Sequence, residues 1–164
     1  MTMPPRPTRI TSGFGVRIGR TGAPTFHAGL DFYGRTGDPV VAVADGTVVK
    51  VATDDARSGG TQGYGNVVAL DHGDGWWSVY AHLSRIDVGE GEAVTEAQQV
   101  GLVGNTSNGK FRGMGAHLHF EIRNASAGTP FPGPYRRWNV DPRTWLEERG
   151  VMYDARARLV SEGD

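Results

Sequence analysis

Cysteine is absent from the 164-residue sequence, which excludes a disulfide framework and a thiolate metal site. The chain also lacks any apolar run close to the roughly 20 residues that a membrane-spanning helix needs, so no membrane span is expected. Its formal net charge of −1 gives no electrostatic reason to expect binding to nucleic acid. No apolar segment follows the first residues, and a secretory signal is therefore not predicted.

Glycine, by contrast, is abundant, with 25 residues that sit singly or in pairs between short β-rich runs. This placement indicates turns between strands, so we expect a mainly β fold of antiparallel sheets. The length suits one domain with a sizeable core, expected at residues 10–150 between an N-terminal tail (1–9) and a C-terminal tail (151–164). The strands are expected at residues 40–44, 47–52, 66–71, 76–81, 99–103 and 117–123.

One short helix is expected near the C-terminal end, over Pro142–Arg149. Asp141 suits the N-cap position, and proline is favoured at the first helical position. Gly150 follows where the helix should stop.

The dipeptide Asp45-Gly46 lies between two of the predicted strands. Asp-Gly in such a place is typical of a type I′ turn, which needs positive φ at both central residues. The sequence therefore predicts a β-hairpin over residues 40–52.

The segment from His117 to Glu121 carries the most informative pattern in the chain. In a β-strand, side chains two residues apart point to the same face, so His117 and His119 would enter one site together. Two histidines in a buried-looking strand are costly to place unless both find partners. Glu121 shares that face, either as a partner that orients an imidazole or as a solvated strand charge.

Two other segments offer side chains of the same chemistry. His27 and Asp31 are four residues apart around Gly29, which would let the backbone bend so that both side chains reach one ion. His82 follows the strand predicted at 76–81. Each motif is weak alone, because isolated histidines are most often structural. Together they suit a catalytic zinc, which usually keeps three protein ligands and one open position.

In this order, the motifs H-x-x-x-D, Y-x-H-L and H-x-H resemble the lysostaphin-type zinc endopeptidases, also called the LytM-like family. The resemblance covers residues 10–146, which is far more than the three motifs. The further segments that carry it are Ile10–Arg17, Gly37–Val48, Tyr64–Asn66, Leu70–Gly73 and Val140–Pro142.

By this resemblance, His27, Asp31 and His119 match the family's zinc ligands, and His82 and His117 match its two catalytic histidines. The family fold implies a two-sheet β-sandwich, similar to a barrel-sandwich hybrid, with zinc on the floor of an open groove. The family activity implies hydrolysis of peptide bonds in bacterial peptidoglycan, in the cross-bridge or the stem peptide. We expect a monomer that acts at the bacterial cell wall.

The chemistry of the residues is consistent with these roles. Three ligands leave a fourth zinc position for water, whose pKa zinc can lower to about 7. A histidine that titrates near neutral pH suits removal of the water proton and its return to the leaving amine. His82 and His117 share these tasks, and the sequence leaves open which of them is the general base.

Two features depart from the family pattern. The loop Gly101–Ala116, which leads to the H-x-H motif, is longer than usual and carries Lys110 and Arg112. We expect it to form one wall of the groove. The lysostaphin branch carries a tyrosine shortly before the first ligand, whereas residues 19–26 contain none.

Two other functions are considered. A non-catalytic family member that activates cell-wall amidases would have lost ligands, but the full set is present here. A biotinyl or lipoyl carrier domain shares the hairpin motif, but its hairpin tip bears a lysine where this chain has Asp45-Gly46. Without a signal, the chain fits a phage lysin or virion-associated lytic domain delivered by lysis, a holin or the virion. A fragment that lacks its signal fits equally.

Overall fold

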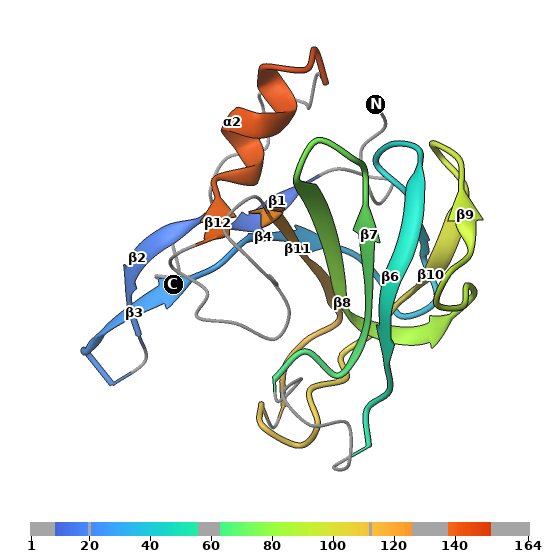
Figure 1. Cartoon of the computed structure of the whole chain (residues 1–164). Coiled ribbons are helices and arrows are strands. Elements are labelled where there is room, and N and C mark those ends of the chain that lie inside the picture. Colours follow the sequence, from blue (N-terminus) through green and yellow to red (C-terminus); the bar gives the residue numbers. More distant parts are fainter. Residues whose placement is uncertain (1–8, 20, 56–62, 112, 126–137, 152–164) are drawn as a thin grey trace.

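The computed structural model describes residues 9–19, 21–55, 63–111, 113–125 and 138–151, and the statements below concern these residues. They form a mainly β fold of antiparallel strands with one short helix near the C-terminal end, as predicted (Figure 1). No helix in these ranges has the length and apolar character needed to cross a membrane. The strands are β1 (Ile10–Ser12), β2 (Gly15–Ile18), β3 (Pro24–His27), β4 (Leu30–Tyr33), β5 (Pro39–Val41), β6 (Gly46–Ala52), β7 (Asn66–Asp71), β8 (Trp76–Ile86), β9 (Ala93–Val94), β10 (Gln99–Val103), β11 (His117–Asn124) and β12 (Asn139–Val140), followed by helix α2 (Pro142–Glu147).

Ten of the described strands belong to one sheet, whose main path runs β1-β4-β11-β8-β7-β6-β9. β10 joins this sheet by pairing with β8 and β5, and β12 pairs with β11. The remaining two strands, β2 and β3, form a separate hairpin that projects from the large sheet (Figure 1). The sheets are therefore very unequal in size, and the small one delivers a single site residue, His27, at the end of β3.

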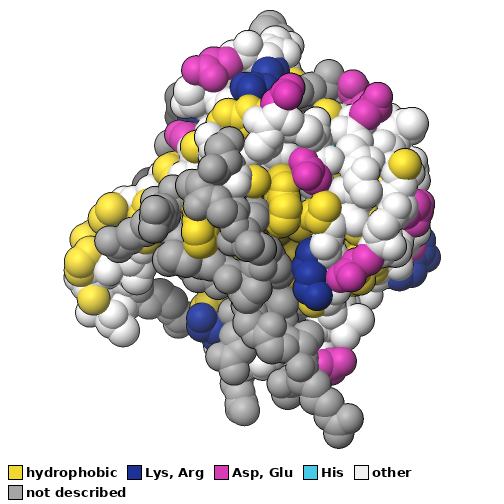
Figure 2. Space-filling view, in the orientation of Figure 1, with side chains coloured by type: hydrophobic (Ala, Val, Ile, Leu, Met, Phe, Trp, Pro, Cys, Tyr) yellow, Lys and Arg dark blue, Asp and Glu magenta, His cyan; other side chains and the backbone are white. Residues whose placement is uncertain are grey.

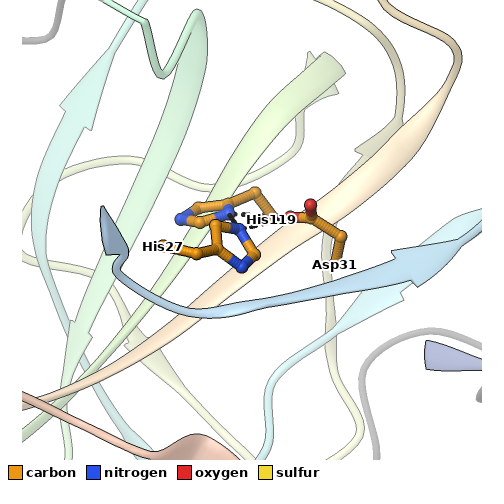
Figure 3. Close-up of side chains that lie close together, drawn as sticks. All are labelled: His27, Asp31 and His119. Carbon is orange, nitrogen blue, oxygen red and sulfur yellow. Dashed lines mark hydrogen bonds and ion pairs between the residues drawn. The ribbon is translucent and has the colours of Figure 1, made fainter. Parts of the chain in front are cut away.

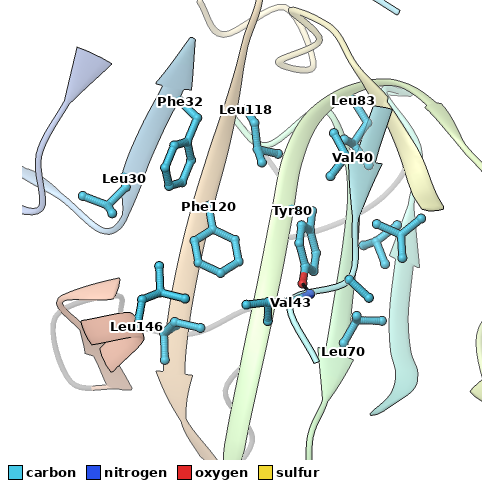
Figure 4. Packing of buried hydrophobic residues seen from close by; sticks show 14 of the residues in the cluster. Leu30, Phe32, Val40, Val43, Leu70, Tyr80, Leu83, Leu118, Phe120 and Leu146 are labelled. Carbon is cyan, nitrogen blue, oxygen red and sulfur yellow. Dashed lines mark hydrogen bonds between the residues drawn. The ribbon is translucent and has the colours of Figure 1, made fainter. Parts of the chain in front are cut away.

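Alternation along the strands separates a hydrophobic core from a polar face. Leu118, Phe120 and Ile122 of β11 are fully buried in the main core together with Phe32 and Tyr80 (Figure 4). The intervening positions of β11 point to the opposite face, as the period of a strand requires. The residues that form the core thereby fix the direction of the histidines between them.

The hairpin predicted at Asp45-Gly46 is wrong. β5 pairs with β10, whereas β6 pairs with β7 and β9, so the two strands beside this dipeptide are not partners. Neither residue has a positive φ, as a type I′ turn would require. Gly46 is needed because a β-carbon there would lie 2.5 Å from the carbonyl oxygen of Asp71.

The C-terminal helix begins as predicted and ends slightly earlier. The backbone N–H of Arg143 donates to the Asp141 side chain at 2.9 Å, which confirms the N-cap, and α2 starts at Pro142. Gly150 has φ +73, a conformation that stops a helix readily. Of the two predicted tails, only Arg9 and Val151 lie within the described residues, so the domain limits stay a prediction; Val151 packs into the core.

Candidate metal centre

The register of two neighbouring strands sets up the centre. β11 pairs antiparallel with β4, so that His119 lies directly opposite Asp31 and His117 lies opposite Tyr33. Side chains at directly opposite positions have β-carbons about 4.5–5.5 Å apart. The predicted alternation of β11 is confirmed, because His117 and His119 share one face while Leu118 between them is buried in the core.

His27 enters the cluster from the end of β3, just before the short turn that leads to β4. Gly29 in this turn was expected to supply a sharp bend, but its φ is not positive. Instead, a β-carbon at Gly29 would lie 2.1 Å from the carbonyl oxygen of Phe120. Glycine is therefore required because the turn packs directly against the backbone of β11. This packing brings His27 and Asp31 close to His119 on that strand.

Three donor atoms from these residues face one another: Nε2 of His27, Oδ1 of Asp31 and Nδ1 of His119 (Figure 3). His27 Nε2 lies 3.1 Å from each of the other two atoms, which are 2.8 Å apart. Tetrahedral donors at zinc bond lengths of about 2.0–2.1 Å lie about 3.3 Å from one another. The three atoms therefore have the chemistry and the spacing of a three-ligand zinc site.

The outer nitrogens of the two candidate ligands are already bonded. His27 Nδ1 lies 2.6 Å from the carbonyl oxygen of Gly13, and His119 Nε2 lies 3.0 Å from Oε1 of Glu121. Because these acceptors hold a proton on the outer nitrogen, each ring presents its other nitrogen to the centre. Such outer hydrogen bonds orient metal-binding imidazoles and raise their basicity.

His82 and His117 form a second pair beside the three donors, with ring centroids 4.8 Å apart. Nδ1 of His82 lies 2.7 Å from the carbonyl oxygen of Thr106, and Nδ1 of His117 lies 2.9 Å from that of Gly115. These bonds to Nδ1 turn Nε2 of both rings towards the cluster. Nε2 of His117 lies 3.7 Å from Oδ1 of Asp31.

The backbone at His82 is unusual. Its φ of +62 lies in the left-handed region, which costs a residue other than glycine about 1–3 kcal/mol. On one side of this residue β8 pairs with β11, up to Ala81, and on the other it pairs with β10, from Leu83. The strain therefore lies where β8 changes partners, and it directs the His82 ring towards the cluster. Strained residues of this kind concentrate at functional sites.

A buried polar network supports His119 from behind. Glu121 is fully buried, and its Oε1 accepts from the Tyr64 hydroxyl at 2.7 Å as well as from His119. Its Oε2 accepts from Arg123 Nε at 2.7 Å and from Asn139 Nδ2 at 2.9 Å. Of the two interpretations of Glu121, the structure supports the partner that orients an imidazole, since no part of this carboxylate is solvated.

Electrostatics make the region between Asp31 and Glu121 favourable for positive charge. Burial alone would raise the pKa of Asp31, but hydrogen bonds with His119 and His27 outweigh it and hold that pKa well below its usual value. Burial likewise opposes protonation of His119, yet its bonds to the two carboxylates raise its pKa to about 9. For Glu121, Arg123 and His119 outweigh burial and lower the pKa to about 2.

His82 has the opposite electrostatic character. Burial, followed by electrostatic repulsion from His119 and His117, lowers its pKa to about 3. The His82 ring is therefore neutral at physiological pH, with its proton on Nδ1 and a lone pair on Nε2.

All five predicted site residues line one open groove of about 770 Å³. The loop before the H-x-H motif forms part of its lining, as predicted, through Lys110, Phe111 and Gly113–Ala116. Arg112 lies outside the described residues. On the other side, Arg17 and Phe26 of the β2–β3 hairpin line the same groove. Hydrophobic side chains gather on this hairpin, where Val16 and Ile18 are 71% and 70% exposed (Figure 2).

Sequence reasoning missed most of the network behind His119. Arg123 carried a usable signal, because it continues the alternation from His117 through His119 and Glu121 on one strand face. Tyr64 lies in a segment that carries the resemblance, but nothing local in the sequence predicts that Tyr64 or Asn139 contacts Glu121, because they reach it from segments 57 and 18 residues away.

Comparison with known proteins identifies a family and several relatives. The model of a family described as "Peptidase family M23" matches residues 25–132. The peptidoglycan DD-endopeptidase ShyA of Vibrio cholerae is 36% identical over 118 residues, which cover 70% of this chain and 24% of that protein. The murein hydrolase activator NlpD of Salmonella typhimurium is 32% identical over 121 residues, 74% of this chain and 26% of that protein. The chain thus spans about a quarter of the length of these curated relatives.

A solved structure gives a fuller match. The catalytic domain of a prophage-encoded M23 protein, EnpA from Enterococcus faecalis, superposes with a TM-score of 0.65 at 30% identity. The match covers 85% of this chain and 92% of that domain.

Proposed function

This chain belongs to peptidase family M23, and from that premise we propose that it is a zinc-dependent endopeptidase acting on peptide bonds of bacterial peptidoglycan. One observation carries the proposal: the triangle formed by His27 Nε2, Asp31 Oδ1 and His119 Nδ1, with sides of 2.8–3.1 Å. Nitrogen and oxygen donors of this kind suit zinc, and three of them leave one position for a non-protein ligand, as in catalytic sites.

The proposed holders of the metal are His27, Asp31 and His119. When bound, zinc would act as a Lewis acid towards the scissile carbonyl and would lower the pKa of its bound water to about 7. Glu121 holds the His119 ring so that Nδ1 is directed at the centre, and the carbonyl oxygen of Gly13 does the same for His27 Nε2. Peptide substrate enters along the open groove that these residues line.

His117 is the better candidate for the general base. It is the more exposed of the two remaining histidines, and its Nδ1 proton is held by the carbonyl oxygen of Gly115, which leaves Nε2 as the acceptor. We infer that His117 Nε2 takes a proton from the attacking water and returns it to the leaving amine. The ring centroid of His82 lies 4.8 Å from that of His117. Neutral His82, with a lone pair on Nε2, is a hydrogen-bond acceptor beside the proposed general base.

The test combines metal content with hydrolysis. The protein should be purified, stripped with a chelator and reloaded with zinc, and its metal content measured by mass spectrometry at each stage. Turbidity loss of purified peptidoglycan should disappear on stripping and return with zinc. Chelator-insensitive hydrolysis, or none in the zinc-loaded protein, would contradict the proposal. Mass spectrometry of the released fragments would identify the bond cleaved.

Similarity to NlpD favours one alternative, a non-hydrolytic activator of murein hydrolases. The complete set of three donors and two further histidines weighs against it, because an activator needs no such set. The two functions separate in the assay above: an activator would leave purified peptidoglycan intact at any zinc occupancy.

Delivery by phage lysis or as part of a virion is a finer proposal. Its support is the structural likeness to a prophage-encoded catalytic domain. Expression of the chain inside bacteria, with and without a co-expressed holin, tests it: holin-dependent lysis is expected, and lysis without the holin would contradict it.

A further inference from the structure

Two cations are among the residues that line the candidate groove. Arg17 lies on β2 in the projecting hairpin, and Lys110 lies in the loop that precedes the H-x-H motif. Both side chains line the groove that contains the five site residues, and both residues are exposed. A peptide bound in this groove would therefore meet a positive side chain from the hairpin and another from the loop.

Neither cation forms an ion pair within the part of the chain that the structure describes. A side-chain N–H of Arg17 donates to the hydroxyl of Ser12, a neutral partner, which steadies the guanidinium and leaves its other donors for a ligand. Nζ of Lys110 lies 5.5 Å from the ring centroid of Phe111, a cation–π contact that does not neutralise its charge.

The acidic residues that line the groove already have partners in the metal centre. Asp31 and Glu121 are the carboxylates among its described lining residues, and both are bonded to His119. By contrast, Lys50 on β6 and Arg85 on β8, outside the groove, each pair with a carboxylate. Among the described lining residues, no carboxylate is therefore left to pair with Arg17 or Lys110. The positive potential of these two side chains favours binding of an anionic ligand.

We propose that Arg17 and Lys110 form a subsite of the groove for free carboxylates of the peptide substrate. This inference rests on the proposed function, and it narrows the substrate to acidic peptides, such as stem peptides with free carboxyl groups. A peptide cross-bridge made of neutral residues would gain no binding affinity from these two side chains. Arg17 in particular can meet a carboxylate with two parallel N–H donors.

The expected effect is modest because both side chains are exposed. Exposed ion pairs contribute little, equivalent to about 1.5- to 5-fold in affinity for each cation. Two cations together should therefore favour a carboxylate over a carboxamide by about 2- to 25-fold in kcat/KM. Salt screens such interactions, so the preference should shrink as ionic strength rises from 0.01 M, where the Debye length is about 30 Å, to 1 M, where it is about 3 Å.

The test compares one substrate in two charge states. Purified peptidoglycan is either mock-treated or amidated with ammonia and a water-soluble carbodiimide, which converts its free carboxylates into carboxamides. Zinc-loaded wild type should hydrolyse the mock-treated material faster, by the factor above and more so at low salt. The double variant Arg17→Gln/Lys110→Gln, and in part each single variant, should lose this preference. Lys50→Gln, which removes a cation outside the groove, should retain it.

The outcomes are distinguishable. Equal hydrolysis of both materials by wild type would overturn the carboxylate subsite and leave the proposed endopeptidase intact. A preference that persists unchanged in a double variant with normal zinc content and thermal stability would also overturn it, because the preference would then arise elsewhere. Failure of zinc-loaded wild type to hydrolyse even mock-treated peptidoglycan would overturn the proposed function, and the subsite with it.

Discussion

His119 lies directly opposite Asp31 in the register of β11 and β4, and its Nδ1 is 2.8 Å from Oδ1 of that aspartate. A slip of one residue in this pairing would turn the histidine into the core and bring Leu118 or Phe120 to the centre. The apolar residues that lock the register therefore also decide whether the three donors meet. A change that disrupts the pairing of β4 with β11 should therefore also disrupt the metal centre.

Gly29→Ala should damage both stability and metal binding. The new β-carbon would lie 2.1 Å from the carbonyl oxygen of Phe120, so the turn between His27 and Asp31 must move away from β11. We expect a loss of about 1–3 kcal/mol in the free energy of unfolding, together with weaker zinc binding. Gly89→Ala is the matched control, because a β-carbon at Gly89 meets no atom within 4 Å. Urea unfolding of both variants measures the effect, and equal midpoints would contradict it.

Glu121→Gln should weaken zinc binding by about 10- to 100-fold, the usual cost of losing a partner of a ligand histidine. The amide can satisfy His119 with its oxygen, but its N–H₂ group would then face the donors of Arg123 and leave a buried cation unpaired. The free energy of unfolding should fall by about 3–5 kcal/mol for this second reason. Competition with a chromophoric chelator measures the affinity. Glu90→Gln, an exposed carboxylate paired with Lys50, serves as control and should bind zinc normally.

His117→Ala should separate binding from catalysis. The residue lies outside the donor triangle, so the variant should keep one zinc per chain and a thermal midpoint close to that of wild type. Loss of a general base lowers hydrolysis by about 10²- to 10⁴-fold. His72→Asn, which alters a histidine outside the groove, should retain full hydrolysis at pH 7.5. Full activity in the His117 variant would remove that residue from the proposed mechanism.

His72 should make stability depend on pH. Its ring is largely buried between the carbonyl oxygen of Asp45, 2.7 Å from Nδ1, and the Ser78 hydroxyl, 2.7 Å from Nε2. Burial lowers its pKa below the value of about 6.5 expected in the unfolded chain, against the opposing effects of Asp45 and Asp71. The unfolded chain therefore takes up the proton first as pH falls.

The stability that neutral His72 provides is thus complete above about pH 6.5 and is lost as pH falls below it. Unfolding free energies of wild type and His72→Asn, measured in urea between pH 5 and pH 7.5, should converge or cross towards the acidic end. The amide of asparagine can still donate to Asp45, so the variant should fold. Parallel curves for the two proteins would show that His72 does not titrate differently on folding.

Local patterns in the sequence were a good guide to single elements and a poor guide to their partners. The strands at Asn66–Asp71 and Gln99–Val103 have the predicted bounds, and the Asp141 cap starts the helix as expected. The Asp45-Gly46 hairpin failed because Asp-Gly also suits a place where two backbones approach closely, and composition cannot tell the two apart. Gly29 was correctly expected to be required, but the reason is its close contact with the backbone of β11 and not a sharp bend of the chain.

The sequence by itself determined the kinds of donor and the strand face on which two histidines lie, because residue type and the period of two are local properties. Only the tertiary structure decided which nitrogen of each ring faces the centre. That choice depends on acceptors such as Gly13 and Thr106, which lie 14 and 24 residues from the histidines they bond. Among the described residues it also left Arg17 and Lys110 without carboxylate partners, since charge pairing follows from the spatial arrangement of strands and loops.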